Sequence, residues 1–151
     1  MMEDRRVILA NKIQQVMTDV ENPLYLSIID NSGGALFSKS FRDENELDAQ
    51  HIGFFLSAMI KFCDYLFDNR FNRLKIGHYY LTLIEQENFF YCYVYQGRSY
   101  EGRMRLARFS RLLKKFQNVW EALNAYHKTG RILSDSMIAQ LDLISAEIFQ
   151  N

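Results

Sequence analysis

The sequence is poor in the residues that build linkers, disulfide frameworks and metal sites. Its 151 residues include one proline, Pro23, seven glycines, two cysteines and three histidines. This leaves little room for linkers or low-complexity tails, and two cysteines without metal spacing suit a reducing compartment. No apolar run approaches the roughly 20 residues that span a bilayer, and no signal segment follows the first residues. We therefore expect a cytoplasmic protein, at most peripheral to membranes.

An excess of charge of one sign is also missing, because 18 basic and 18 acidic residues give a formal net charge of zero. This balance argues against a protein that wraps nucleic acid with a broad basic surface. Apolar residues are abundant, with 48% hydrophobic and 15% aromatic residues, which is too rich for a disordered chain. A chain of this length can bury a sizeable core. Because no repeat or linker divides it, we expect residues 1–151 to form a single domain.

Helical spacing of apolar residues predicts four helices, over residues 1–22, 44–67, 102–128 and 131–151. The first is expected to end before Pro23, because proline biases the preceding residue away from helical geometry. Gly130 suits a left-handed cap after the third helix. Ser134 suits the N-cap of the last helix, which is appended to the rest of the domain.

Five segments with strand-like patterns lie between these helices, at residues 24–30, 35–41, 73–76, 79–85 and 89–95. Glycines at 33–34 and at 77 predict the turns. The last strand is apolar on both faces, with Phe90 and Cys92 on one and Tyr91 and Tyr93 on the other, so its sheet needs cover on both sides. The expected fold class is α/β (α+β): a three-layer α/β/α sandwich with a five-stranded, mostly antiparallel sheet, in the order helix-β-β-helix-β-β-β-helix-helix.

This order resembles the roadblock and longin superfamily, and the first hairpin carries the likeness as Ser27-Ile28-Ile29-Asp30-Asn31-Ser32-Gly33-Gly34-Ala35-Leu36-Phe37. Residues 54–66 are similar to the helix that follows that hairpin in the family. Its last three strands are matched by Lys75-Ile76-Gly77-His78-Tyr79-Tyr80-Leu81-Thr82-Leu83-Ile84 through Val94-Tyr95-Gln96-Gly97. The likeness covers residues 4–130. A helix before the first strand is the roadblock arrangement and two helices after the last strand are the longin one, and this chain has both.

The resemblance implies a small non-catalytic module that needs no cofactor. It further implies a homodimer, or a heterodimer with related modules, that binds small Ras-like GTPases in trafficking, polarity or nutrient signalling. The identity of the partner GTPase stays open, and so does any effect on nucleotide exchange or hydrolysis.

The second helix carries the candidate interface. Its apolar stripe consists of Ile52, Phe55, Met59, Phe62 and Leu66. Neighbouring apolar residues widen this stripe beyond what one contact needs, so the helix is expected to touch something on two sides. The strand at 73–76 should be a sheet edge guarded by basic residues. The predicted dimer or partner interface consists of Phe54, Ala58, Lys61, Tyr65, Arg73 and Lys75.

The most uneven charge lies between residues 98 and 115, where seven basic residues accompany one acid, Glu101. The candidate basic surface consists of Arg98, Arg103, Arg105, Arg108, Arg111 and Lys115. A solvated helix face explains this pattern, and so does contact with an acidic protein or with an anionic membrane. Nucleic acid is the weakest alternative, because no groove-reading motif accompanies the charge.

Motifs that carry chemistry are missing. The chain has neither G-x-x-x-x-G-K-[ST] nor G-x-G-x-x-G, so it is not itself a GTPase or a dinucleotide enzyme. Its histidines are too scattered for a metal triad. Cys92 and His78 could in principle act as nucleophile and base, but a thiol in an apolar strand is usually inert packing. We predict no catalytic, cofactor-binding or metal-ligating residue.

The tyrosine row of the last strand leaves two interpretations open. It could line a small-molecule pocket, as in a PAS/GAF-like sensor domain, or it could form the layer beneath a covering helix. A peripheral membrane adaptor that uses the basic helix is a further alternative function.

Overall fold

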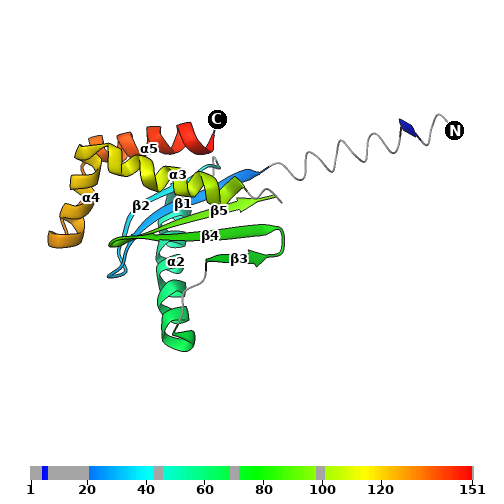
Figure 1. Ribbon diagram of the computed structural model, residues 1–151, viewed down its shortest axis with the longest axis horizontal. Coiled ribbons are helices and arrows are strands. Elements are labelled where there is room, and N and C mark those ends of the chain that lie inside the picture. Colours follow the sequence, from blue (N-terminus) through cyan, green and yellow to red (C-terminus); the bar gives the residue numbers. More distant parts are fainter. Residues whose placement is uncertain (1–4, 7–20, 43–45, 69–71, 98–100, 151) are drawn as a thin grey trace.

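The computed structural model describes residues 5–6, 21–42, 46–68, 72–97 and 101–150 (Figure 1). Its elements are β1 (Asn22–Asp30), β2 (Ala35–Ser40), α2 (Glu46–Phe67), β3 (Arg73–Ile76), β4 (Tyr79–Gln86), β5 (Phe89–Gln96), α3 (Glu101–Lys115), α4 (Gln117–Thr129) and α5 (Asp135–Phe149). The helix predicted within residues 1–22 falls almost wholly outside the described residues. Asn22, at its predicted end, already belongs to β1.

The five strands form one sheet in the order β2-β1-β5-β4-β3, and every neighbouring pair is antiparallel. The predicted turns are confirmed, because Gly33 and Gly77 have φ angles of 109° and 60°, which glycine adopts without steric cost. Pro23 lies in β1 beside a register shift in the pairing with β5. A bulge at the start of a strand tolerates the missing N–H of proline.

Helices cover both faces of the sheet, as the two apolar faces of β5 predicted (Figure 1). α3 and α5 pack on the face that carries Leu26, Ile28 and the tyrosines of β5. α2 packs on the opposite face, where Ile29, Phe90 and Cys92 meet its side chains. The expected three-layer sandwich is confirmed.

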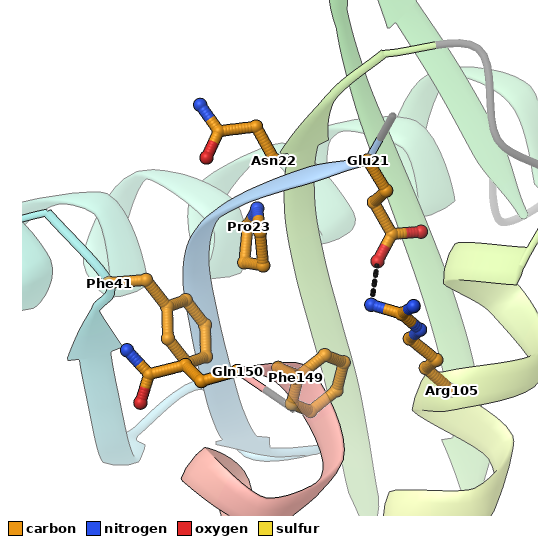
Figure 2. Close-up of a pocket in the computed structure, with 7 residues that line it drawn as sticks. All are labelled: Glu21, Asn22, Pro23, Phe41, Arg105, Phe149 and Gln150. Atoms are coloured by element: carbon orange, nitrogen blue, oxygen red, sulfur yellow. Dashed lines mark hydrogen bonds and ion pairs between the residues drawn. The ribbon is translucent and has the colours of Figure 1, made fainter. Parts of the chain in front are cut away.

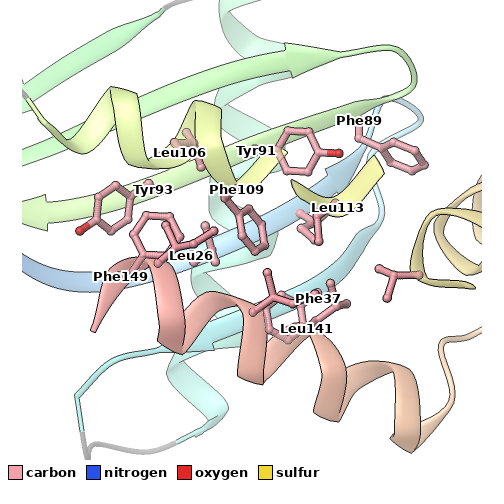
Figure 3. Packing of buried hydrophobic residues seen from close by; sticks show 14 of the residues in the cluster. Leu26, Phe37, Phe89, Tyr91, Tyr93, Leu106, Phe109, Leu113, Leu141 and Phe149 are labelled. Carbon is pink, nitrogen blue, oxygen red and sulfur yellow. The ribbon is translucent and has the colours of Figure 1, made fainter. Parts of the chain in front are cut away.

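The tyrosine row of β5 is packed under α3 and α5 rather than lining an open pocket. Tyr91, Tyr93 and Tyr95 are at most 1% exposed. The ring of Tyr93 lies 4.4 Å from that of Phe149 and 4.9 Å from that of Tyr95, while Tyr91 meets Phe109 edge-on at 6.2 Å. Figure 3 shows these rings interleaved with leucines of both helices. Aromatic packing therefore fills the described part of this face, which removes the main reason for a sensor pocket there.

The single helix predicted over residues 102–128 is wrong, because the chain breaks at Phe116 between α3 and α4. Phe116 has φ −92° and ψ 94°, an extended conformation, and it is 42% exposed although it continues the apolar stripe. The break lets α4 turn so that Val119 and Leu123 join the same core as α3 and α5.

The two predicted signals for helix ends are confirmed. Gly130 caps α4 in the left-handed conformation, and the Ser134 hydroxyl accepts a hydrogen bond from the Met137 N–H.

The apolar stripe identified on α2 does not face the sheet as a whole, although Met59 packs partly against the core on that side. Gly53, Leu56, Ser57 and Ile60 are buried, whereas Phe55, Phe62 and Leu66 of the predicted stripe are 63%, 58% and 53% exposed. The helix approaches β2 so closely that a Cβ on Gly53 would lie 2.7 Å from the Ser38 Oγ. Small residues therefore face the sheet, and the largest side chains of α2 point away from it.

The turn between β1 and β2 is held from both sides. On one side Ser57 of α2 donates a hydrogen bond of 2.8 Å to the Gly33 carbonyl. On the other side His127 of α4 lies 2.8 Å from the buried Asp30 carboxylate, which also accepts from the Ser32 N–H. The first hairpin thus links the two helical layers.

Candidate functional site

The outward side of α2 is the main candidate site. Six of its large apolar side chains are more than half exposed: Phe54, Phe55, Phe62, Tyr65, Leu66 and Phe67. They follow one another along the C-terminal two thirds of the helix, which extends away from the sheet (Figure 1). Monomeric proteins rarely expose a contiguous apolar patch of this kind without a partner. Phe67 continues the side of the buried Ile60, seven residues earlier on the helix, so we call the other five residues the α2 outer face.

The helical part of the predicted interface lies on or beside this face. Phe54 and Tyr65 belong to it, with exposures of 59% and 87%. Ala58 and Lys61, which are also exposed, lie between them at helical spacing. The Lys61 side chain reaches the turn at Gly33. These four residues form one row along the helix.

The strand part of the predicted interface lies on the opposite face of the sheet. Arg73 and Lys75 lie over the ring of Tyr80, with cation-to-centroid distances of 4.6 and 5.8 Å, and Tyr80 packs against the core beneath α3 and α5. Leu74, between them, packs on the α2 side instead. β3 nevertheless is an edge, paired with β4 and with no other described strand. The basic pair and the α2 row therefore lie on opposite faces of the sheet.

The candidate basic surface is smaller than its sequence suggests. Arg103 donates to the Leu83 carbonyl at 3.2 Å, Arg105 pairs with Glu21 at 2.9 Å, and Lys114 pairs with Glu87 at 2.6 Å. Arg98 lies outside the described residues. Arg108, Arg111 and Lys115 are exposed and form no ion pair within the described parts of the chain.

An open hollow of about 420 Å³ lies where β1 begins and α5 ends, lined by Glu21, Asn22, Pro23, Phe41, Arg105, Phe149 and Gln150. Figure 2 shows Glu21 and Arg105 joined on one side of this hollow, with Phe41 and Phe149 on the other. The Glu21 side chain is 2% exposed. Its Oε2 accepts hydrogen bonds from the Tyr93 hydroxyl at 2.7 Å and from Arg105. The charged wall of the hollow is thus occupied by an internal ion pair.

Burial dominates the electrostatics of Glu21. Desolvation raises the pKa of this carboxyl above its ordinary value of 4.5, against the opposing effects of the Tyr93 hydroxyl and of Arg105. Oε1 is buried and has no hydrogen-bond partner among the described residues, which adds to the cost of ionising the group. Sequence reasoning missed this site, because a single glutamate before a proline carries no pattern that predicts burial.

The raised pKa predicts a pH dependence of stability. As the pH rises past 4.5, the unfolded chain loses the Glu21 proton before the folded chain does, so ionisation favours unfolding until the folded pKa is passed. We expect the wild-type chain to lose stability relative to Glu21→Gln as the pH rises above 4.5 toward the folded-state pKa, measured by urea unfolding. The exposed Glu121 of α4, which takes no part in this site, gives the control Glu121→Gln. A constant difference between wild type and Glu21→Gln across this range would contradict the assignment.

Catalytic chemistry finds no support in the geometry of Cys92 and His78. Cys92 lies opposite Leu83 on β4, whereas His78 lies in the turn before Tyr79, four residues further along that strand. Along the sheet, Cys92 and His78 are therefore at least about 13 Å apart. Burial raises the pKa of the Cys92 thiol far above its ordinary value, so the thiolate needed for attack is not formed at neutral pH. Among the described residues no group of three His, Cys, Asp or Glu side chains could hold a metal ion.

The two cysteines should therefore react very differently. Cys63 of α2 is partly exposed and Cys92 is fully buried. We expect a thiol reagent such as Ellman's reagent to modify one cysteine rapidly in the folded protein and the second only after unfolding. Peptide mapping should assign the fast site to Cys63, and rapid native labelling of Cys92 would contradict the packing of β5.

The arrangement as a whole is a β2-β1-β5-β4-β3 antiparallel sheet between α2 and the α3–α5 layer. No family model matches the sequence, and no curated protein matches it. Among solved structures the chain is similar to the Roadblock/LC7 domain from Streptomyces avermitilis, with 12% identity, a TM-score of 0.43, and 62% of this chain and 87% of that chain covered.

Two further solved structures are similar in the same way. Myxococcus xanthus MglB shares 14% identity with a TM-score of 0.43, covering 64% of this chain and 85% of its own. A chain of the full-length AP-3 complex, described as a homology model in a stretched open conformation, shares 8% identity with a TM-score of 0.43, covering 83% and 95%. In the described residues no helix is long and apolar enough to cross a membrane.

Proposed function

We propose that this chain is a non-catalytic interaction module that dimerises through the α2 outer face and the β3 edge. In this proposal the dimer binds or regulates a small Ras-like GTPase within a trafficking or signalling assembly. The observation that carries the proposal is the set of five large apolar side chains left exposed on one side of a single helix. Their exposure in the isolated chain is costly unless a partner covers them.

The β3 edge supplies the second half of the contact. β3 is short, at four residues, and its side away from β4 meets no described strand. Ile76 at its end is 60% exposed. Two copies related by a half-turn perpendicular to the sheet would pair their β3 strands antiparallel and would bring their α2 helices together on one face. The same surface would suit a related module, so a heterodimer is the alternative form.

The mechanism proposed for such a module is selective binding. A partner with two conformations is shifted toward the one that the module binds more tightly, by as much as its affinities for the two differ. No chemistry of the module itself is required. The two free thiols, Cys63 and Cys92, support the cytoplasm as its location.

The test is affinity capture of purified Ras-like GTPases from the source organism, each loaded with GDP or with a non-hydrolysable GTP analogue. We expect one GTPase to bind preferentially in one nucleotide state. Tyr65→Glu, which places a charge on the α2 outer face, should weaken this binding, whereas Ile132→Glu should not. These positions are 87% and 83% exposed, so both substitutions are tolerated by the fold. Binding of no GTPase in either state would contradict this part of the proposal.

A further inference from the structure

The side of α3 that points away from the sheet carries a basic stripe. Leu106, Phe109 and Leu113 bury the inward side of the helix. Opposite them, at a spacing of four, three and four residues, lie Met104, Arg108, Arg111 and Lys115. All four are exposed, Met104 to 71%. The stripe is about 16 Å long, and its three charges have no internal partner within the described residues. We call these four residues the α3 stripe.

The neighbouring helix α5 carries the opposite charge. Its 15 residues include three acids and no basic residue. Asp135, Asp142 and Glu147 are exposed, and Leu143 among them is 72% exposed. Lys39 approaches the Asp142 carboxylate at 3.8 Å, but the Asp142 side chain stays 51% exposed. We call the three acids and Leu143 the α5 acidic face.

These two surfaces lie side by side in one layer. α3 and α5 run along the same face of the sheet in opposite directions (Figure 1), and the rings of Phe109 and Phe149 meet between them at 5.8 Å. The outer surface of this layer is therefore split into a basic half and an acidic half. A uniformly anionic partner, such as a membrane or a nucleic acid, would attract one half and repel the other.

We propose that the occupant of this surface is a second copy of the chain, bound face to face. A half-turn about an axis that runs between the two helices and parallel to them places the α3 stripe of each copy over the α5 acidic face of the other. The contact is self-complementary, as a two-fold interface must be. Met104 and Leu143 supply the apolar groups that a charged contact needs for affinity.

This contact goes beyond the proposed dimer and does not depend on it. α2 lies on the other face of the sheet, so both contacts can form on one copy and together extend dimers into larger assemblies. Two helix faces of this size form a small interface, below about 1,200 Å², which is typical of weak and transient association. Because its charges are exposed, the contact should weaken with salt, in contrast to the apolar contact of α2.

The test reverses the charge of the α3 stripe in one variant and the charge of the α5 acidic face in another. One variant carries Arg108→Glu, Arg111→Glu and Lys115→Glu, and the other carries Asp135→Lys and Glu147→Lys. All are made in a Tyr65→Glu background, so that a contact through α2 does not contribute. By sedimentation velocity at low salt we expect the background chain to self-associate. The association constant of each charge variant alone should be at least tenfold lower. An equal mixture of the two variants should associate again, because every like-charged pair becomes a pair of opposite charges.

The controls separate this proposal from its alternatives and from the α2 dimer. Raising NaCl from about 50 mM to about 300 mM shortens the screening length from roughly 14 Å to roughly 6 Å, and should reduce the association of the background chain at least tenfold. Failure of the mixture to associate, with both variants folded by circular dichroism, would overturn the proposal. So would a monomeric background chain that instead binds phosphatidylserine vesicles or polyglutamate, which would identify a membrane or an acidic protein as the occupant. The dimer proposed through α2 is tested separately, in the chain that retains Tyr65.

Discussion

Tyr65→Glu is expected to weaken self-association of the chain by roughly 30- to 1,000-fold, which corresponds to about 2–4 kcal/mol. The Tyr65 side chain is 87% exposed, so the isolated subunit loses little when the ring is replaced. In the proposed dimer the same position is covered by the partner's helix. A carboxylate there must give up its hydration, which the exposed Lys61 one turn earlier offsets only in part. At high salt, where association through the α3 stripe is suppressed, the double variant Phe62→Glu, Tyr65→Glu should be monomeric at every accessible concentration.

Light scattering coupled to size-exclusion chromatography measures this effect. Ile132→Glu is the matched control, since Ile132 is 83% exposed but lies in the loop before α5, away from α2. It should associate as the wild-type chain does. Equal association of the Tyr65 and Ile132 variants would show that α2 does not form the contact.

Arg105→Ala is expected to lower the free energy of unfolding by about 2–4 kcal/mol, because it leaves the Glu21 carboxylate buried without its counter-charge. Arg105 is itself 29% exposed, and Glu21 is only 2% exposed. The loss therefore comes mainly from the stranded acid. Adding Glu21→Gln to Arg105→Ala should recover part of the stability, since the amide needs no counter-charge. Denaturant unfolding of the two single variants and the double variant gives the coupling free energy between Glu21 and Arg105.

An exposed ion pair on the same helix provides the comparison. Lys114 lies 2.6 Å from Glu87, closer than Arg105 lies to Glu21, but its side chain and that of Glu87 are 40% and 51% exposed. Exposed pairs contribute at most about 1 kcal/mol, so Lys114→Ala should cost less than that. If the two alanine variants proved equally destabilised, burial of Glu21 would not be the cause.

Much of the sheet could be predicted from the sequence alone. The period-two pattern placed β3 at its observed bounds, and it placed β4 and β5 to within one residue. The two apolar faces of β5 correctly required helices on both sides. End signals with a local mechanism also held, namely the left-handed Gly130 and the Ser134 cap. These features depend on neighbouring residues, which is why a single sequence is enough to find them.

The orientation of α2 could not be predicted from the same pattern. The spacing rule selects the largest apolar residues as the buried stripe, and on α2 these are phenylalanines. The sheet instead meets Gly53 and Ser57, because β2 offers small side chains there and the helix packs close. Most of the stripe that the pattern identified is exposed, and in the proposed dimer the second copy covers it.

Two further differences depend on contacts that are distant in sequence. The break at Phe116 has no glycine or proline to announce it, and it follows from the packing of Val119 and Leu123 into the core. Glu21 is buried because Tyr93 and Arg105 reach it from β5 and α3.

The sequence pattern grouped Arg73 and Lys75 with α2, because strand direction alone does not fix which face of the sheet a side chain occupies. Such contacts become visible only when the chain is folded.

Sedimentation equilibrium of the unaltered chain over a wide concentration range, at low and at high salt, tests the central claim most directly. The contact through α2 is apolar, so we expect a reversible dimer that persists at high salt, where association through the α3 stripe is suppressed. A chain that stays monomeric at high salt at every concentration would show that the exposed phenylalanines of α2 do not pair two copies.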